Sequence, residues 1–399
     1  MHYLVYFVVM AIFFDHFSQM PIISLYAREL GATSFWIGLV VGMYSFSNMA
    51  GNLVAGRWID SRGRRNIMIA GLVMAAAGVA AYALAGTAQQ LAAARFVHGL
   101  GAGLVSPAAF ALIGDRSQET RRGQAMAGAG AAIGAAAIAG PAYGGIMAQH
   151  VGWDGVFLSV AALLLVTAAL AWLLVQDRYQ GGNGQRRDPY PVWSLLRKPE
   201  LRRAFLGAFA LMFAMGILVY ALPLKVDALG FGSATTGMLM SAFGLVAILL
   251  FVSPANRLSD HLGRIKPAVW GLAFIAAALL TLGMVATRSA MLGAMVVFGT
   301  GFAMVFPAMA ALVVDETRSE ERGRAFGLFY AFFSLGVIAG SLVVGAMDAT
   351  PDQGFLTGAL GIAAMAMALL ATGRRGMQGR VGRDPAPAIT RPSMASRDG

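Results

Sequence analysis

The sequence of 399 residues contains no cysteine and few charged residues. Without cysteine, disulfide bonds, thiolate metal sites and thiol catalysis are excluded. Charged residues make up 12% of the chain and hydrophobic residues 58%, whereas soluble domains contain about 25% and about 45–50%. A water-soluble fold of this length could not cover so much apolar surface with so few charges. The composition therefore indicates an integral membrane protein.

The apolar residues occur in unbroken stretches of about twenty residues or more, which predicts helices rather than the alternating strands of a membrane barrel. Each is long enough to cross a hydrocarbon core of about 30 Å. The expected fold class is all-α with twelve transmembrane helices, and because Leu4 follows no basic leader, we expect a mature first helix rather than a signal peptide. The stretches are residues 4–26, 35–56, 67–86, 91–114, 123–148, 155–175, 204–224, 233–255, 266–286, 289–313, 324–346 and 354–373.

Basic residues outnumber acidic ones by 30 to 19, which gives a formal net charge of +11. If both termini are cytoplasmic, 26 of the 30 Lys and Arg fall on the cytoplasmic side, and only Arg28, Lys225 and Arg288 fall in outer loops. Cytoplasmic loops carry an excess of Lys and Arg. The pattern predicts a multi-pass protein of the inner (plasma) membrane with both termini cytoplasmic. Because the charge is dispersed between spans, it argues against a nucleic-acid partner.

The chain divides into two halves that repeat each other. The longest polar stretch predicts a linker at residues 176–203, between six-helix bundles at 1–175 and 204–373, and the Arg- and Pro-rich tail at 374–399 is expected to be disordered. At an offset of 200, Asp60, Gly63, Arg64, Asp115 and Arg122 recur as Asp260, Gly263, Arg264, Asp315 and Arg322. Parallel repeats of this kind pack about an axis along the membrane normal, with a substrate site between them.

A charged loop follows the second span. Residues 56–65 read Gly-Arg-Trp-Ile-Asp-Ser-Arg-Gly-Arg-Arg, and residues 256–264 are a weaker copy in which Asn256 replaces the first glycine. With the repeat, these loops make the chain similar to the major facilitator superfamily (MFS) over nearly its whole length. The resemblance implies two six-helix bundles related by pseudo-twofold symmetry, alternating access, and a gating loop. The gating residues implied are Gly56, Asp60, Gly63, Arg64, Arg65, Asp260, Gly263 and Arg264.

Other readings of these loops remain open. The basic residues also serve membrane topology alone, although an acid such as Asp60 has no topological purpose. The charges at helix ends are expected to tie loops to helices, with family precedent for gating: Asp115, Arg122, Asp315 and Arg322.

Comparing the two halves isolates three polar residues inside the first. Asp15, Arg95 and His98 align with Met215, Met295 and Phe298. A membrane-buried carboxylate is costly and normally faces the interior, and because protonation removes its charge, Asp15 is a candidate proton site. The resemblance to the family's fourth helix implies proton transfer at Arg95, where His98 replaces a usual glutamine.

Each of these residues has a structural alternative. Ser18, Gln19 or a neighbouring helix could satisfy Asp15, and Arg95 could snorkel to the outer interface. A direct ion pair between Asp15 and Arg95 is not predicted, because they differ in depth. His16 is expected to be incidental.

The fifth span carries the residues that bear most on the direction of transport. Its segment Gly140-Pro141-Ala-Tyr-Gly144-Gly145 resembles the antiporter motif of proton-coupled drug exporters, with Ala136 in place of the first glycine. Small residues allow close helix approach, and a proline bends the helix by removing a donor. A bent, smooth helix between the halves would control leak and direction. Ordinary close packing is the alternative.

The sequence thus favours a proton-coupled MFS exporter of drug-like or lipophilic molecules. An exporter of sugars or metabolites, an uptake symporter for a small anion and a non-transporting membrane sensor remain alternatives. The expected partners are a small-molecule substrate, protons and the lipid bilayer, and we expect a monomer, no enzymatic activity, no metal, and no cofactor beyond the proton gradient. Residues expected to line a cavity are Gln19, Asn48, Asn52, Phe209, Phe213, Phe243 and Phe302.

Overall fold

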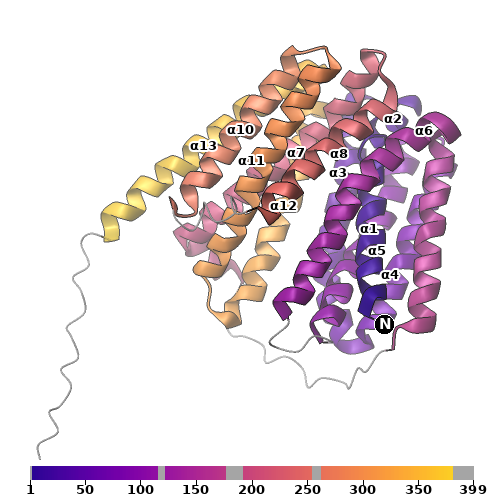
Figure 1. Cartoon of the computed structure of the whole chain (residues 1–399), viewed down its shortest axis with the longest axis horizontal. Helices are drawn as coiled ribbons and strands as arrows, with labels where there is room; N and C mark the ends of the chain where they lie inside the picture. The colour runs from indigo at the N-terminus through magenta and orange to yellow at the C-terminus, as the bar shows by residue number, and fades with distance from the viewer. Residues whose placement is uncertain (1, 116–121, 177–191, 254–261, 381–399) are drawn as a thin grey trace, which may run out of the picture.

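The computed structural model describes residues 2–115, 122–176, 192–253 and 262–380 (Figure 1). Within these ranges the regular elements are all helices. The first half contains α1 (His2–Gln19), α2 (Ile23–Glu29), α3 (Ser34–Arg62), α4 (Arg64–Ala80), the 3₁₀ helix η1 (Ala81–Leu84), α5 (Ala88–Asp115) and α6 (Arg122–Leu174). The second contains η3 (Val192–Arg197), α7 (Pro199–Ala228), α8 (Gly232–Val252), α10 (Ile265–Met284), α11 (Arg288–Asp315), α12 (Ser319–Ala346) and α13 (Pro351–Arg380).

The described helices account for the twelve predicted spans. Ten are long and apolar enough to cross a membrane, and the bent pair α1–α2 makes an eleventh. The 53-residue α6 is broken at Gly152, where φ is 72° and ψ is −179°. At 1.5 Å per residue its two arms together measure about 80 Å, enough for two crossings. The all-α fold with twelve transmembrane helices is therefore confirmed.

Three boundaries differ from the prediction. The first span bends by 47° between Gln19 and Ile23, because Pro21 lacks an amide donor and disfavours a helical residue before it. Helix α7 begins at Pro199, inside the predicted linker, since proline fits the first turn of a helix. Helix α13 continues to Arg380, into the segment predicted to be disordered, and no proline follows Pro351 until residue 385.

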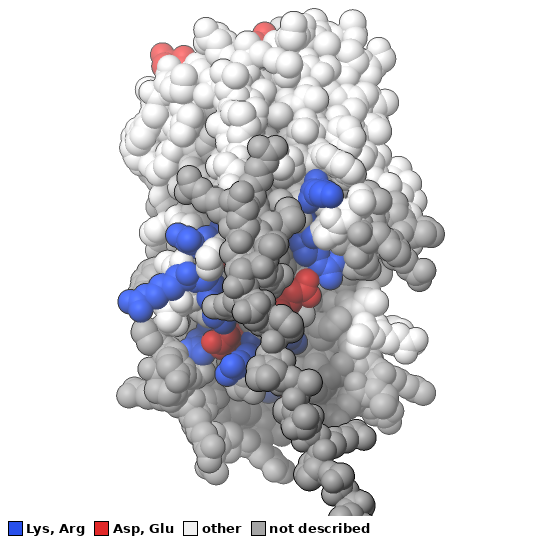
Figure 2. Space-filling view, turned by 90° about the vertical axis from the view of Figure 1, so that its left-hand side faces the viewer, with Lys and Arg blue, Asp and Glu red and all other residues white. Residues whose placement is uncertain are grey.

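Two ends of the bundle can be distinguished. At the basic end α4, α7 and α10 begin and α5 and α11 finish; at the far end α3 and α11 begin and α7 and α12 finish. Figure 2 shows Lys and Arg side chains gathered toward one end of the face in view. The described ion pairs at the basic end use Arg64, Lys198, Arg203 and Arg264. This is the distribution that the charge pattern predicts.

The two halves contact each other through α3 and α12 at the far end. A Cβ atom on Gly38 would lie 2.5 Å from the carbonyl oxygen of Ser341, and one on Gly345 would lie 2.5 Å from that of Ser34. Real Cβ atoms do not come this close to a backbone oxygen, so only glycine permits this approach. The two helices therefore touch backbone to backbone at the far end.

The same helix faces separate toward the basic end. Gly56 on α3 lies 18 positions from Gly38, and Gly327 on α12 lies 18 positions from Gly345, which is five turns in each case. These glycines therefore share a face with the ones in contact, yet no heavy atom of the described residues lies within 4 Å of the point that a Cβ on either would occupy. The halves are closed against each other at the far end and diverge at the basic end.

Polar contacts reinforce the closed far end. Arg28 forms an ion pair with Asp227, which joins the end of α2 to the end of α7. The hydroxyl of Ser34 donates to Oδ1 of Asp348 at 2.5 Å, and the Tyr220 hydroxyl donates to the Ser34 carbonyl at 3.3 Å. Each of these contacts links the first half to the second.

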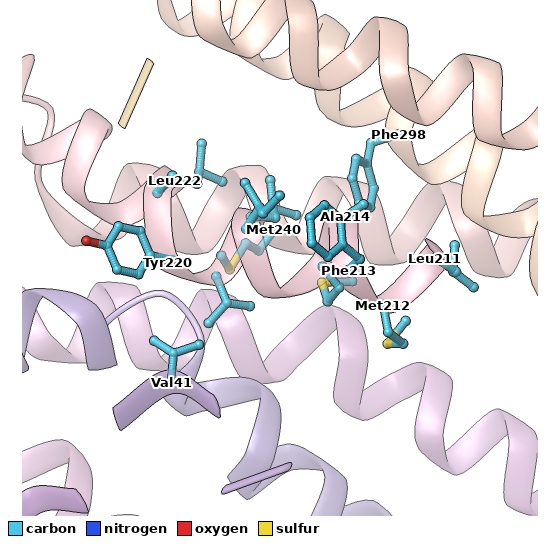
Figure 3. Packing of buried hydrophobic residues seen from close by; sticks show 14 of the residues in the cluster. Val41, Leu211, Met212, Phe213, Ala214, Tyr220, Leu222, Met240 and Phe298 are labelled. Atoms are coloured by element: carbon cyan, nitrogen blue, oxygen red, sulfur yellow. The ribbon is translucent and has the colours of Figure 1, made fainter. Parts of the chain in front are cut away.

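Buried hydrophobic residues form two clusters, and the larger one spans both halves. Figure 3 shows part of it: Tyr220, Phe213 and Leu211 of α7, with Val41 of α3 on one side and Phe298 of α11 on the other. A second cluster lies wholly within the first half. The larger cluster thus extends from α3 of the first half through α7 to α11 of the second.

Candidate functional site

Asp15 lies in the interior of the first half and contacts His98 directly. Both side chains are fully buried, and Oδ2 of Asp15 is 2.6 Å from Nε2 of His98. The other oxygen, Oδ1, accepts a hydrogen bond from Nε2 of Gln19 at 3.4 Å. The Ser18 hydroxyl donates to the backbone carbonyl of Asp15 at 2.8 Å. The structure therefore joins α1 to α5 through an acid–histidine pair that the sequence did not predict as a contact.

The second nitrogen of His98 contacts a tyrosine. Nδ1 lies 2.6 Å from the hydroxyl oxygen of Tyr82, which is also fully buried, in η1. The hydroxyl of Tyr26 donates to the backbone carbonyl of Tyr82 at 2.7 Å. Asp15, His98 and Tyr82 therefore form a continuous hydrogen-bonded chain from α1 through α5 to η1.

Glycines allow these helices to approach closely. A Cβ on Gly78, one turn before Tyr82, would lie 2.5 Å from the backbone nitrogen of His98. A Cβ on Gly99 would lie 2.2 Å from the hydroxyl of Ser47 on α3. Because neither position has room for a side chain, glycine at both sites brings α3, α4 and α5 close around His98.

Arg95 lies beside this chain, with its guanidinium inside the bundle. It is 4% exposed, and Nη2 donates to the carbonyl of Val41 at 3.4 Å. Its guanidinium carbon is 5.5 Å from the Tyr44 ring centroid and 6.0 Å from that of Tyr82. Among the described residues, Nε and Nη1 have no hydrogen-bond partner. The expected alternative of snorkelling to the interface does not fit this burial.

Sequence reasoning missed several members of the cluster. His16, expected to be incidental, stacks on Tyr44 at a centroid distance of 4.4 Å, and Tyr44 meets His98 edge to face at 4.8 Å. A signal for them does exist in the repeat, because His16, Tyr44 and Tyr82 align with Gly216, Gly244 and Leu282. Polar aromatic residues that occur in one half only therefore mark the site as well as ionic ones do.

The glycines of the predicted antiporter motif contact both α1 and α8. A Cβ on Gly144 would overlap the carbonyl oxygen of Ser18 at 1.9 Å, and Gly140 lies against Phe17. Gly145 faces the carbonyl of Ser233 on α8, and the Ser233 hydroxyl donates to the Gly145 carbonyl at 2.8 Å. Helix α6 therefore connects the turn after Asp15 with the second half.

Pro141 also lies at the contact with α8. Its carbonyl oxygen would be 2.3 Å from a Cβ on Gly237. The helix continues through Pro141, and the non-helical residue of α6 is Gly152. The proline marks a point of close helix contact.

The predicted gating loops form the same ion pair in each half. Arg64 pairs with Asp115, and Nε of Arg264 is 2.9 Å from Oδ2 of Asp315, 200 positions later. Gly63 and Gly263 have φ values of 85° and 76°, which a residue with a side chain rarely adopts. Both pairs connect a loop to the end of a helix within one half.

Other gating residues are placed only in part. Arg65 donates to the backbone carbonyl of Trp172, and Gly56 faces open space. Nε of Arg322 is buried with no partner in the described part of the chain. The side chains of Asp60 and Arg122, and the whole of Asp260, lie outside the described residues.

The residues predicted to line a cavity fall into two groups. In the first half Gln19 is buried against Asp15, and Asn52, on the same face as Gly56, donates to Asn48 at 3.0 Å. In the second half the phenylalanines pack in two pairs, with centroid distances of 6.1 Å for Phe209–Phe213 and 5.3 Å for Phe243–Phe302. The first half thus supplies polar groups and the second an aromatic surface.

The comparisons with known proteins identify the family. The model of the Major Facilitator Superfamily matches residues 5–253 and 204–393. The chain belongs to the Major Facilitator Superfamily. It is a multi-pass integral membrane protein of a transporter family, as the loop pattern and the repeat predicted.

The curated relatives of this MFS chain include named resistance proteins. It is 24% identical over 352 residues to the quinolone resistance protein NorA of Staphylococcus aureus, covering 86% of this chain and 89% of the relative. It is 25% identical over 343 residues to the multidrug resistance protein MdtG of Salmonella arizonae, covering 83% and 84%. An uncharacterised MFS-type transporter of Methanocaldococcus jannaschii is 25% identical over 357 residues, covering 86% and 88%.

Solved MFS-like structures share the fold. A bacterial homologue of the human lysosomal transporter Spinster, in an inward-facing and unoccupied conformation, has a TM-score of 0.75 at 14% identity and covers 93% of this chain and 94% of its own. A POT family transporter in complex with a thioalcohol-conjugated peptide has a TM-score of 0.76 at 13% identity, covering 94% and 96%. At this identity the likeness establishes the fold alone.

Proposed function

We propose that this MFS protein exports drug-like or lipophilic small molecules in exchange for protons, by alternating access. The observation that carries the proposal is the fully buried contact between Asp15 and His98. Both groups bind and release protons, and a buried ionisable group in a membrane span is a functional-site candidate.

A contact path leads from this pair to the interface between the halves. Asp15 lies one turn before Ser18, whose backbone meets Gly144 of α6. On the next residue, Gly145, α6 meets Ser233 of α8 in the second half. Gain or loss of one proton changes the charge of the buried pair by one unit. We infer that this change favours one arrangement of α1 and α6, and thereby one access state.

Two observations support export over uptake. The small-residue face of α6 resembles the antiporter motif, and it lies at the contact between the halves. The relatives NorA and MdtG are named for resistance to quinolones and to multiple drugs. The phenylalanine pairs within α7 and between α8 and α11 are apolar groups of the kind that bind lipophilic compounds.

The positive-inside rule assigns the basic end to the cytoplasm. The far end is then the outer side, and the closed far end corresponds to a state that receives substrate from the cytoplasm. We expect both termini to be cytoplasmic, the protein to lie in the plasma membrane as a monomer, and transport to need only the proton gradient and no bound cofactor.

A second candidate rests on Arg95. Two of its nitrogens are buried without a partner in the described part of the chain, and an unpaired buried cation is costly. An anionic substrate would supply the missing charge. A proton-coupled uptake symporter for a small anion is therefore the competing function, and an exporter of sugars or metabolites shares the same fold.

Flux into proteoliposomes tests these functions against each other. The purified protein is reconstituted, a pH gradient is imposed, and movement of a cationic dye, a small anion and a sugar is followed, with an ionophore that collapses the gradient as control. Movement of dye against its gradient, coupled to proton entry, supports the exporter. Proton-driven anion or sugar uptake without dye movement would overturn it.

A further inference from the structure

The hydroxyl of Tyr82 forms a hydrogen bond with Nδ1 of His98, the ring nitrogen that does not face Asp15. The two contacts of the imidazole have equal lengths: 2.6 Å from Nε2 to Asp15 Oδ2 and 2.6 Å from Nδ1 to the Tyr82 oxygen. All three residues are fully buried. The Tyr82 backbone is held by the hydroxyl of Tyr26. Because these side chains are buried, each proton of the Asp15–His98–Tyr82 hydrogen-bonded chain is assigned to one of its own atoms.

Hydrogen-bond chemistry restricts that assignment. An ionised carboxylate only accepts, so Nε2 must carry the proton that is donated to Asp15. A neutral His98 then has a lone pair on Nδ1, which accepts from the Tyr82 hydroxyl. If His98 were doubly protonated, Nδ1 would donate to the tyrosine oxygen and the hydroxyl proton would need another acceptor. The other group that hydrogen-bonds to the Tyr82 hydroxyl is the Arg95 guanidinium, which only donates and therefore cannot accept that proton.

We propose that Tyr82 is a positioning residue that fixes His98 as the neutral Nε2–H tautomer, so that the exchangeable proton binds to the Asp15 carboxyl. In the unloaded pair Asp15 is a carboxylate and Nε2–H donates to it. In the loaded pair Asp15 has gained one proton, Nε2–H still donates to its carbonyl oxygen, and Tyr82 keeps its own proton. Only the part played by that proton in transport rests on the function proposed above.

A nearby buried acceptor fits the loaded state. Among the described residues Oε1 of Gln19 is buried without a hydrogen-bond partner, and the amide nitrogen of the same side chain donates to Oδ1 of Asp15. If the amide rotates by half a turn, its oxygen replaces the nitrogen beside Oδ1. It then accepts the proton of a carboxyl group, which the present orientation cannot do. Asp15 thus has a partner in both protonation states.

The surrounding charges also oppose a positive imidazole. The titratable and charged groups around His98 are Asp15 and His16 on α1, Tyr44 on α3, Tyr82 on η1 and Arg95 on α5. The guanidinium of Arg95 lies over the Tyr44 and Tyr82 rings. From α6 the ring of Phe157 packs on Tyr82 and adds no charge. A positive charge on His98 would be repelled by the charge of Arg95, because both side chains are buried and water screens the repulsion little.

Nitrogen NMR of ¹⁵N-histidine-labelled protein tests the tautomer. The chain has five histidines, so the His98 signals are identified by their loss in His98→Gln. In the unaltered protein we expect the signals of one neutral Nε2–H tautomer at His98 and no imidazolium signal. In Tyr82→Phe the freed Nδ1 can carry a proton, so a protonated Asp15 can donate to Nε2, and the Nδ1–H tautomer is expected beside the Nε2–H tautomer as the pH is lowered. Tyr26→Phe is the matched control, because it removes a hydroxyl bound to Tyr82 without freeing either imidazole nitrogen.

The pH profile of transport gives the second readout. Without the hydrogen bond from Tyr82, Nε2–H is a weaker donor to Asp15. The ionised carboxylate of the unloaded state therefore loses more stabilisation than the protonated carboxyl of the loaded state. We expect Tyr82→Phe to raise the pH of half-maximal transport by about half a unit, and Tyr26→Phe to leave it unchanged. An imidazolium signal in the unaltered protein, or an unchanged single Nε2–H tautomer in Tyr82→Phe as the pH is lowered, would overturn the proposal. If the tautomer behaves as expected but transport is independent of pH, the positioning role stands and the proton-coupled function fails.

Discussion

Adding a methyl group at Gly145 is expected to open the far end of the molecule. A Cβ there would lie 2.4 Å from the carbonyl oxygen of Ser233 and 3.0 Å from the Cα of Gly237. Because these are backbone atoms of α8, the clash cannot be relieved by a rotamer change. The two helices must move apart, and the hydrogen bond from Ser233 to the Gly145 carbonyl lengthens.

The expected free-energy change is the sum of a packing penalty and a hydrogen-bond penalty. Overpacking a tight contact costs about 1–3 kcal/mol, and a weakened hydrogen bond costs about 1 kcal/mol. Both penalties apply only while the halves are closed at the far end. Gly145→Ala should therefore shift the equilibrium toward a far-open state by about 2–4 kcal/mol, or about 30- to 700-fold, since about 1.4 kcal/mol corresponds to a factor of ten.

Spin-label distances measure this shift. The chain has no cysteine, so Thr33→Cys and Ala228→Cys place labels at two exposed far-end sites on opposite halves. The label distance should lengthen in Gly145→Ala. Gly130→Ala on the same helix is the control, because no heavy atom lies within 4 Å of its Cβ position and both variants gain the same helix propensity. An unchanged distance distribution in Gly145→Ala would refute the reasoning.

Two further predictions concern ion pairs. Arg28→Asp should disfavour the closed far end and lengthen the same label distance, whereas the double variant Arg28→Asp with Asp227→Arg should restore it; failure of the swap would show that this pair does not hold the halves together. Asp315→Asn should lower the free energy of unfolding, measured by thermal denaturation in detergent, by less than about 1 kcal/mol, because its pair with Arg264 is partly exposed; a larger loss would show that the pair is a structural anchor.

The sequence predicted the architecture well because membrane burial leaves a strong signal. Three features can be recognised without any knowledge of side-chain contacts: the long apolar stretches, the excess of Lys and Arg between them, and the repeat at an offset of 200. The pairs Arg64–Asp115 and Arg264–Asp315 show the repeat at the level of single interactions. The bend at Pro21 and the break at Gly152 lie where a local backbone preference interrupts an otherwise uniform apolar pattern.

The candidate site was predicted only as separate residues. Asp15, Arg95 and His98 stood out as ionisable groups present in one half, but their partners depend on how deeply each helix is set against the next. The contact of Tyr82 with His98 depends on the close approach of α4 to α5 that Gly78 permits. The sequence offers glycines without saying which helix faces them, so Tyr82 could not be placed beside His98 from spacing alone.

The central claim is that the Asp15–His98 pair couples protons to transport, and Asp15→Asn tests it most directly. Asparagine keeps the size of the side chain and one carbonyl acceptor for His98 but cannot bind a proton in the relevant range. In proteoliposomes, downhill substrate flux and pH-driven accumulation are measured on the same preparation. We predict that downhill flux persists while accumulation driven by the pH gradient is lost. Accumulation at the unaltered rate in Asp15→Asn would contradict the account.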